Sequence, residues 1–195
     1  GTWTVYDSSG RRSIYGETSD EKIYRPDNQN KTYSWNLSRS VDLNDNSMHV
    51  YYDQSEHTAN HVLYVKEIRY TANESMGRSP KLFVRFKLKN RPDFYLSTAG
   101  GFIMKMDKLL DEIEVGKIGL IYNSTLWSYR FVYNTSADSG RPLLQKVEST
   151  KNSTAPTFIY QPASHILVWQ NQYNPFASDP QNSMPQNPQG TKYFE

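Results

Sequence analysis

Apolar and polar residues alternate along several short stretches of the chain, and this pattern predicts β-strands with one buried face. Residues 81–89 alternate most strictly, because every even-numbered position is apolar and all but one of the odd-numbered positions are basic. Residues 126–133 behave similarly, with an aromatic residue at every odd-numbered position. A period of two is the spacing with which side chains reach the same face of a strand.

Short stretches of this kind recur along the whole chain and are separated by residues that favour turns, such as Asp7-Ser8-Ser9-Gly10 and Asn90-Arg91-Pro92-Asp93. The predicted strands span residues 2–6, 32–37, 48–52, 61–70, 81–89, 94–97, 117–122, 126–133, 157–160 and 165–170. About ten strands at this spacing predict an all-β fold, an antiparallel β-sandwich of jelly-roll-like type. Local pattern does not distinguish a jelly roll from an immunoglobulin-like topology.

One segment departs from the alternation. Residues 107–114 predict a short helix, because Leu109, Leu110 and Ile113 fall on one side and acidic residues on the other. No repeat of long period is visible in the sequence.

Residues 171–195 differ from the rest in composition, since they combine four prolines with many Asn, Gln and Ser residues. We therefore expect a β-sandwich domain over 1–170 and an extended tail over 171–195. The tail is predicted to pack on its own domain or on a neighbouring subunit.

Composition excludes several classes of protein. The chain has no cysteine, which rules out disulfides, thiolate metal sites and cysteine nucleophiles. It contains 22 Lys and Arg against 20 Asp and Glu, so its bulk charge does not suit coating nucleic acid or an anionic membrane. No apolar run approaches the roughly 20 residues that a membrane-spanning helix needs.

No catalytic motif is visible, and we predict neither enzymatic activity nor a cofactor. His49 and His165 are isolated, and the sequence contains no G-x-S-x-G elbow or glycine-rich phosphate loop. Asp53, His57 and His61 are the candidate metal ligands. Two histidines four residues apart suit a metal when they lie on a helix, but their surroundings predict a loop that leads into a strand.

Ligand binding is the alternative chemistry, and it has two sets of candidates. Arg85 and Lys87 lie on the basic face of the predicted strand 81–89, which suits phosphates, acidic glycans or an acidic partner, or else forms a solvated face with Glu67 opposite. Aromatic side chains stack on sugars and anchor protein interfaces. The aromatic candidates are Trp35, Trp127, Tyr129 and Trp169.

Six N-x-S/T triplets would be glycosylated if the chain were secreted through a glycosylating pathway. Their acceptors are Asn30, Asn36, Asn73, Asn123, Asn134 and Asn152. The absence of cysteine favours the alternative that the chain never meets a glycosyltransferase.

Together these patterns predict a structural protein that assembles. The first hypothesis is a subunit of a viral capsid or spike, located in the virion or at a cell surface, which forms homo- or hetero-oligomers with other structural subunits and binds a glycan receptor. The second is a carbohydrate-binding module or cell-surface adhesin. The third is a β-sandwich that binds nucleic acid through the face of residues 81–89.

Overall fold

The computed structural model describes residues 1–137, 139–151 and 156–158. The predicted strand at 165–170, the tail over 171–195, and the candidates Trp169 and Asn152 lie outside the described residues. The predicted strand at 157–160 lies only partly inside them.

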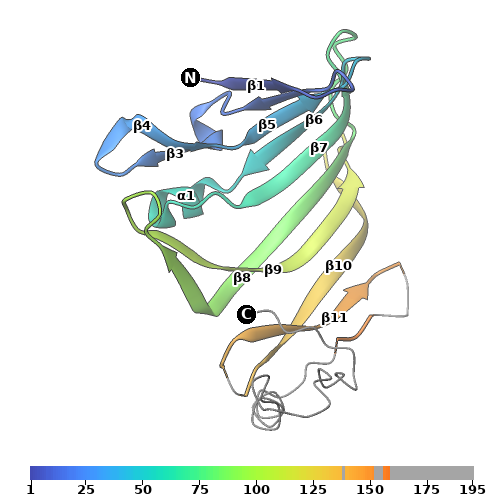
Figure 1. The fold of residues 1–195 in the computed structure, drawn as a ribbon. Helices are drawn as coiled ribbons and strands as arrows, with labels where there is room; N and C mark the ends of the chain where they lie inside the picture. The colour runs from blue at the N-terminus through green and yellow to red at the C-terminus, as the bar shows by residue number, and fades with distance from the viewer. Residues whose placement is uncertain (138, 152–155, 159–195) are drawn as a thin grey trace, which may run out of the picture.

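A single antiparallel sheet dominates the fold (Figure 1). Its nine strands run in the order β1-β2-β5-β6-β7-β8-β9-β10-β11, so that nearly every strand pairs with its neighbour in the chain. The strands are β1 (Trp3–Tyr6), β2 (Arg12–Tyr15), β5 (Leu37–Val41), β6 (Asn46–Tyr52), β7 (Val65–Asn73), β8 (Leu82–Ser97), β9 (Met104–Lys117), β10 (Ser124–Thr135) and β11 (Pro142–Ser149). Figure 1 shows the sheet strongly curved rather than flat.

Three small elements lie at the end of the sheet opposite most of the hairpin turns. A hairpin of β3 (Lys22–Arg25) and β4 (Asn28–Trp35) is inserted between β2 and β5, after the 3₁₀ turn η1 (Ser19–Glu21). Helix α1 (Gln54–Asn60) connects β6 to β7. Phe102, between β8 and β9, joins these elements because its ring contacts both Tyr33 of β4 and His61 after α1 edge-on.

The antiparallel all-β prediction is confirmed, but the described residues form one curved sheet and a hairpin rather than the two packed sheets of a jelly roll. The predicted helix over 107–114 is wrong, because these residues form part of β9 and pair with both β8 and β10. The one α-helix of the described residues is α1, where we predicted a loop. Asp53 caps its start by accepting the Ser55 N–H, and His61 ends it in the left-handed conformation.

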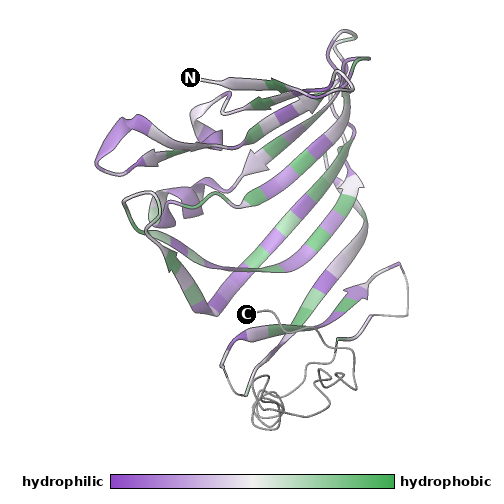
Figure 2. Ribbon diagram, viewed as in Figure 1, coloured by the Kyte–Doolittle hydropathy of each residue, from purple (hydrophilic) through white to green (hydrophobic). Residues whose placement is uncertain are grey.

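The buried part of the sheet centres on Phe83, whose side chain has no exposed surface. A glycine faces it on the next strand: a Cβ on Gly116 would lie 2.4 Å from both the Phe83 ring and the Ser124 carbonyl oxygen. The other buried apolar residues of the described ranges are Ile14, Val41, Val50 and Ala72 in the sheet and Ile23 in the β3–β4 hairpin. Figure 2 shows polar and apolar positions alternating along the strands, as expected for a sheet with two differing faces.

Two hairpin turns are built to the same plan. Asp7 accepts the backbone N–H groups of Ser9 and Arg11, and Asp42 accepts those of Asn44 and Asn46. In each turn the residue three positions after the aspartate has a positive φ and donates its N–H to the aspartate carbonyl. The chain therefore uses one turn twice, 35 positions apart, although only the aspartate is identical and no repeat was visible in the sequence.

Among the described residues, no helix is long and apolar enough to span a membrane.

Candidate functional site

Charged side chains cross the middle of the sheet from β7 to β9. We call these residues the charged band: Glu67, Arg69, Arg85, Lys87, Glu112 and Glu114. The strand register brings them together, because Glu67 pairs with Arg85, Arg85 with Glu114, and Lys87 with Glu112. Cross-strand neighbours of opposite charge stabilise a sheet.

Every member of the charged band is in an ion pair. Glu67 accepts from Arg69 Nε at 2.5 Å and lies 2.8 Å from Arg85 Nη2. The second half of the band is continuous with the first, since Arg85 Nη1 lies 3.3 Å from Glu114. Lys87 Nζ completes it, at 2.7 Å from Glu114 and 3.1 Å from Glu112. Three cations face three carboxylates, so the band has no net charge.

Glu67 is the most buried ionisable residue of the charged band, with 5 % of its surface exposed. Burial alone would raise its pKa, but the hydrogen bonds from Arg69 and Arg85 outweigh burial and hold the pKa below its ordinary value. Hydrogen bonds from Ser128 and then from Lys87 lower the pKa of Glu112 in the same direction. The folded chain therefore holds both carboxylates ionised.

This arrangement predicts that the protein loses stability in acid. The folded-state pKa values of Glu67 and Glu112 lie below the ordinary 4.5, so as the pH falls the unfolded chain binds protons first. We expect the free energy of unfolding to decline below about pH 4.5 and to keep falling through the lower folded-state values. Urea unfolding at a series of pH values measures this. A Glu67→Gln variant should show a shallower decline, and an identical decline would contradict the assignment.

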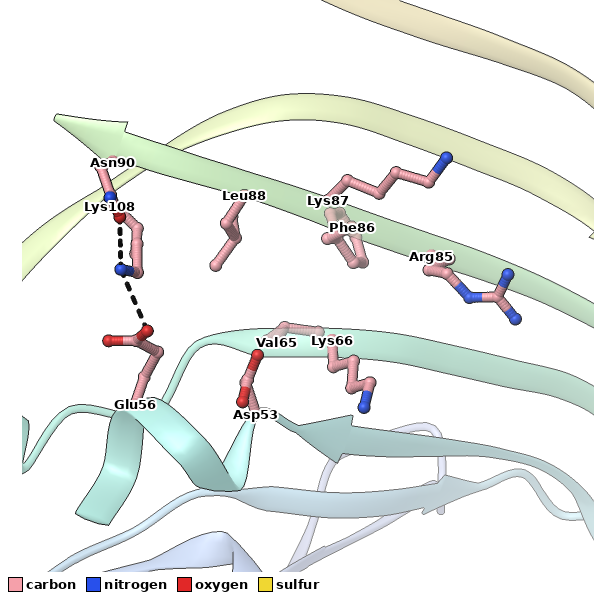
Figure 3. Close-up of a pocket in the computed structure, with 10 residues that line it drawn as sticks. All are labelled: Asp53, Glu56, Val65, Lys66, Arg85, Phe86, Lys87, Leu88, Asn90 and Lys108. Atoms are coloured by element: carbon pink, nitrogen blue, oxygen red, sulfur yellow. Dashed lines mark hydrogen bonds and ion pairs between the residues drawn. The ribbon is translucent and has the colours of Figure 1, made fainter. Parts of the chain in front are cut away.

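A cavity of about 510 Å³ lies beside the charged band, where β7 parts from β8. Val65, Phe86 and Leu88 supply its apolar lining, and α1 borders it through Asp53 and Glu56. Figure 3 shows Lys108 reaching past Asn90 to Glu56, at 2.6 Å from Asn90 Oδ1 and 3.0 Å from Glu56. The Glu56 carboxylate raises the pKa of Lys108, and the pair ties α1 to β9.

The structure separates the candidate metal ligands by role. Asp53 caps α1, the His61 ring packs against Phe102, and His57 lies on the helix. Burial, followed by the neighbouring His61, lowers the pKa of His57. No group of three potential ligands gathers within the described ranges.

The aromatic candidates lie on separate elements. Trp35, on β4, packs edge-on against Trp3 at 5.9 Å and donates its Nε1–H to the Gly1 carbonyl. Trp127 and Tyr129 are on β10, where the Lys151 ammonium lies 4.7 Å from the Trp127 ring centre. The structure therefore does not gather Trp35 with the other two into one platform.

The described acceptor asparagines differ in accessibility. Asn36 donates its side-chain amide to the Glu21 carbonyl and to Ser34, and Asn73 donates its own to Asn44 and Asn46. Asn123 lies in an exposed loop. Asn30 and Asn134 are also exposed, on β4 and β10.

One pair on β6 has the elements of a nucleophile and its base. Ser47 Oγ lies 3.4 Å from His49 Nε2, beside a hollow of about 190 Å³ that Glu74 also lines. A triad needs a third group that orients the histidine. Glu74 is held instead by Arg12 and Arg39, and among the described residues no carboxylate bonds His49.

The sequence indicated Arg85 and Lys87, with Glu67 opposite, but it did not indicate Arg69. It also did not indicate Glu112 and Glu114 as partners, because both fell in the predicted helix. The sequence signal that could have identified Glu112 and Glu114 is the spacing of the charges. Two acids two residues apart, at 112 and 114, complement two cations two residues apart, at 85 and 87.

Comparisons with known proteins relate this fold to bacterial toxins and effectors. Residues 1–95 match the family described as SpvB, the Salmonella virulence plasmid 65 kDa B protein. The N-terminal domain of the effector SpvB from Salmonella typhimurium is 15 % identical with a TM-score of 0.59, over 82 % of this chain and 61 % of that domain. The sequence matches no curated protein.

Two larger assemblies are similar as well. A TcdB2–TccC3–Cdc42 structure is 13 % identical with a TM-score of 0.60, and the Photorhabdus luminescens Tc holotoxin pore is 13 % identical with a TM-score of 0.61. Each match covers 80 % of this chain and 10 % of the other. The chain shares its fold with these bacterial proteins. It spans less than two thirds of the SpvB domain and a tenth of the Tc chains.

These matches overturn the functional prediction. The hypothesis of a viral capsid or spike subunit is wrong, and so is the predicted virion location, because the family match and the similar structures are all bacterial toxin or effector proteins. They do not support the adhesin or the nucleic-acid-binding alternatives either. The sequence pattern of many short strands and no catalytic motif is common to all these classes, which is why it did not separate them.

Proposed function

We propose that this chain is a non-enzymatic structural domain of a bacterial toxin or effector, in which its curved sheet forms one segment of a larger β-sheet wall. Its partners are then neighbouring segments and subunits of that toxin. The observation that carries the proposal is the curved nine-stranded sheet, which resembles a small part of the TcdB2–TccC3 complex.

The two edges of the sheet support this function. At one edge β1 pairs with β2 alone among the described strands, and Trp3, Val5 and Tyr6 are more than half exposed. An exposed apolar edge strand without Lys or Pro is a template for a further strand. At the other edge, residues 156–158 already bond to β11, with Phe158 donating its N–H to the Gln145 carbonyl.

The charged band suits a structural role better than a catalytic one. Its ion pairs satisfy each charge with a partner in the sheet, which fixes the register of β7, β8 and β9. A catalytic group needs a perturbed charge that faces a substrate. The pairing of these residues with one another instead supports a rigid wall.

The test is the size and composition of the native particle. A tagged chain, expressed in its source cells and purified under native conditions, should elute in a large complex that contains other toxin subunits. Val5→Lys should disrupt this complex because a lysine blocks strand addition at the β1 edge. Leu96→Lys, at a half-exposed position of β8 that is separated from β1 by four strands, is the matched control and should leave it intact. A monomer of 22.6 kDa alone would contradict the proposal.

A further inference from the structure

The loop between β9 and β10 exposes three consecutive apolar side chains, which we call the apolar tip: Leu120, Ile121 and Tyr122. Leu120 is fully exposed, and Ile121 and Tyr122 are 82 % and 85 % exposed. The alternation pattern predicts a strand over 117–122, but β9 ends at Lys117 and β10 begins at Ser124. The tip therefore projects beyond the sheet. Runs of exposed apolar residues are rare on monomeric proteins and mark interaction sites.

The backbone holds this loop in a tight turn. A Cβ on Gly119 would lie 2.1 Å from the Tyr122 carbonyl oxygen, so a larger residue does not fit there. At its base, Ile118 donates its N–H to the Lys81 carbonyl at 2.8 Å. The tight turn and this hydrogen bond thus hold the apolar tip in a defined position beside the start of β8.

Cationic side chains surround the base of the apolar tip. Lys117 ends β9, and Arg78 and Lys81 precede β8; all three are exposed, and none is in an ion pair with any residue that the structure describes. Glu74, the acid in the adjoining β7–β8 turn, is held by Arg12 and Arg39. The described residues around the tip therefore carry a net positive charge.

A hollow of about 700 Å³ lies next to the apolar tip, and it is lined by Thr71, Arg78, Ser79, Lys81 and Leu82. Leu82 pairs directly with Lys117, which places the hollow beside the base of the loop. Thr71 has a φ of 69°, unusual for a β-branched residue, and its Oγ1 accepts the Lys81 N–H at 3.1 Å. Its hydroxyl proton remains available to an acceptor in the hollow.

We propose that this end of the sheet binds the surface of an anionic lipid bilayer. The apolar tip inserts among the acyl chains, with Tyr122 at the interface, while Arg78, Lys81 and the Thr71 hydroxyl bind lipid phosphates. An exposed apolar tip surrounded by cations suits a bilayer better than a flat protein surface, because apolar insertion and charge attraction act at the same place. This site is independent of the β1 edge and of the charged band, so it goes beyond the proposed wall function.

The chain has no cysteine, so a single introduced thiol can report on insertion. Ile121→Cys carries an environment-sensitive fluorophore, and the full chain is mixed with vesicles of phosphatidylcholine alone or with added phosphatidylserine. We expect a blue shift with the anionic vesicles and binding about tenfold or more tighter than to the neutral ones, decreasing with salt. Ile103→Cys, equally labelled at the opposite end of β9, is the matched control and should not shift.

Two variants separate the contributions in vesicle sedimentation, with circular dichroism to verify folding. Leu120→Ser with Tyr122→Ser should abolish binding, and Lys81→Glu with Lys117→Glu should reduce it to the level of neutral vesicles. Equal shifts at residues 103 and 121, or no preference for anionic lipid, would overturn the proposal. A shift at residue 121 that rises with protein concentration without vesicles would overturn it too, because the tip would then bind a second copy of the chain.

Discussion

Replacing Phe83 with alanine should lower the free energy of unfolding by about 4 kcal/mol. The Phe83 ring is completely buried, fills the space that Gly116 leaves open, and lies 4.6 Å below the Arg85 guanidinium carbon. Removing it leaves a cavity that the paired strands on both sides prevent from collapsing. Urea unfolding followed by tryptophan fluorescence measures the change.

Phe94→Ala is the matched control for this prediction. Phe94 is on the same strand but 52 % exposed, so its removal should cost only about 0.5 kcal/mol. Phe83→Leu should fall between the two, because it removes less volume. If Phe83→Ala stayed as close to the wild type as Phe94→Ala, the centre of the core would be misassigned.

Replacing Glu67 with glutamine should lower the free energy of unfolding by about 3 kcal/mol at neutral pH. The change keeps the shape of the side chain but removes the charge that Arg69 and Arg85 share, and it leaves a guanidinium beside a buried neutral group. The partly exposed arginines keep some contact with water, which places the cost at the lower end of the range for broken buried ion pairs.

Glu148→Gln is the corresponding control. Glu148 pairs with Lys146 on β11, where the two side chains are 43 % and 38 % exposed and neither is buried as Glu67 is, and such exposed pairs contribute little. We expect that variant to unfold at nearly the wild-type urea concentration. Equal losses in the two variants would show that burial does not distinguish the charged band from the other surface ion pairs.

The local pattern predicted strands best where apolar and polar residues alternate with a period of two, although the fully buried Phe83 lies on the same face as Arg85 and Lys87 rather than on the apolar face. The predicted strand over 126–133 lies within β10, and all but the first residue of the one over 81–89 lie within β8, because a period of two leaves no helical alternative. The helix prediction for residues 107–114 was wrong because their pattern is ambiguous. Over eight residues their apolar and acidic positions fit both the period of a helix and the period of a strand. The cations that pair with their acidic residues lie on another strand, β8.

The start of helix α1 was predictable from two residues of the sequence. Asp53 followed three residues later by Glu56 is a sequence signal for a helix start, but Asp53 was interpreted as a candidate metal ligand in a loop. The candidate site was only half predictable, because Arg85 and Lys87 are visible as a basic face whereas their neutralisation depends on strand register. The register that brings Glu67, Arg85 and Glu114 together depends on how three strands pair in the sheet, and the local sequence does not determine this pairing.

The central claim is that this curved sheet is a wall segment of a larger bacterial assembly, and cryo-electron microscopy of the native complex tests it most directly. We predict that the domain will be found in a hollow particle, with β1 extended by a strand from a neighbouring segment and the charged band inside a continuous sheet. A map in which the domain stands apart, with the β1 edge open to solvent and no sheet continuing from it, would contradict the account.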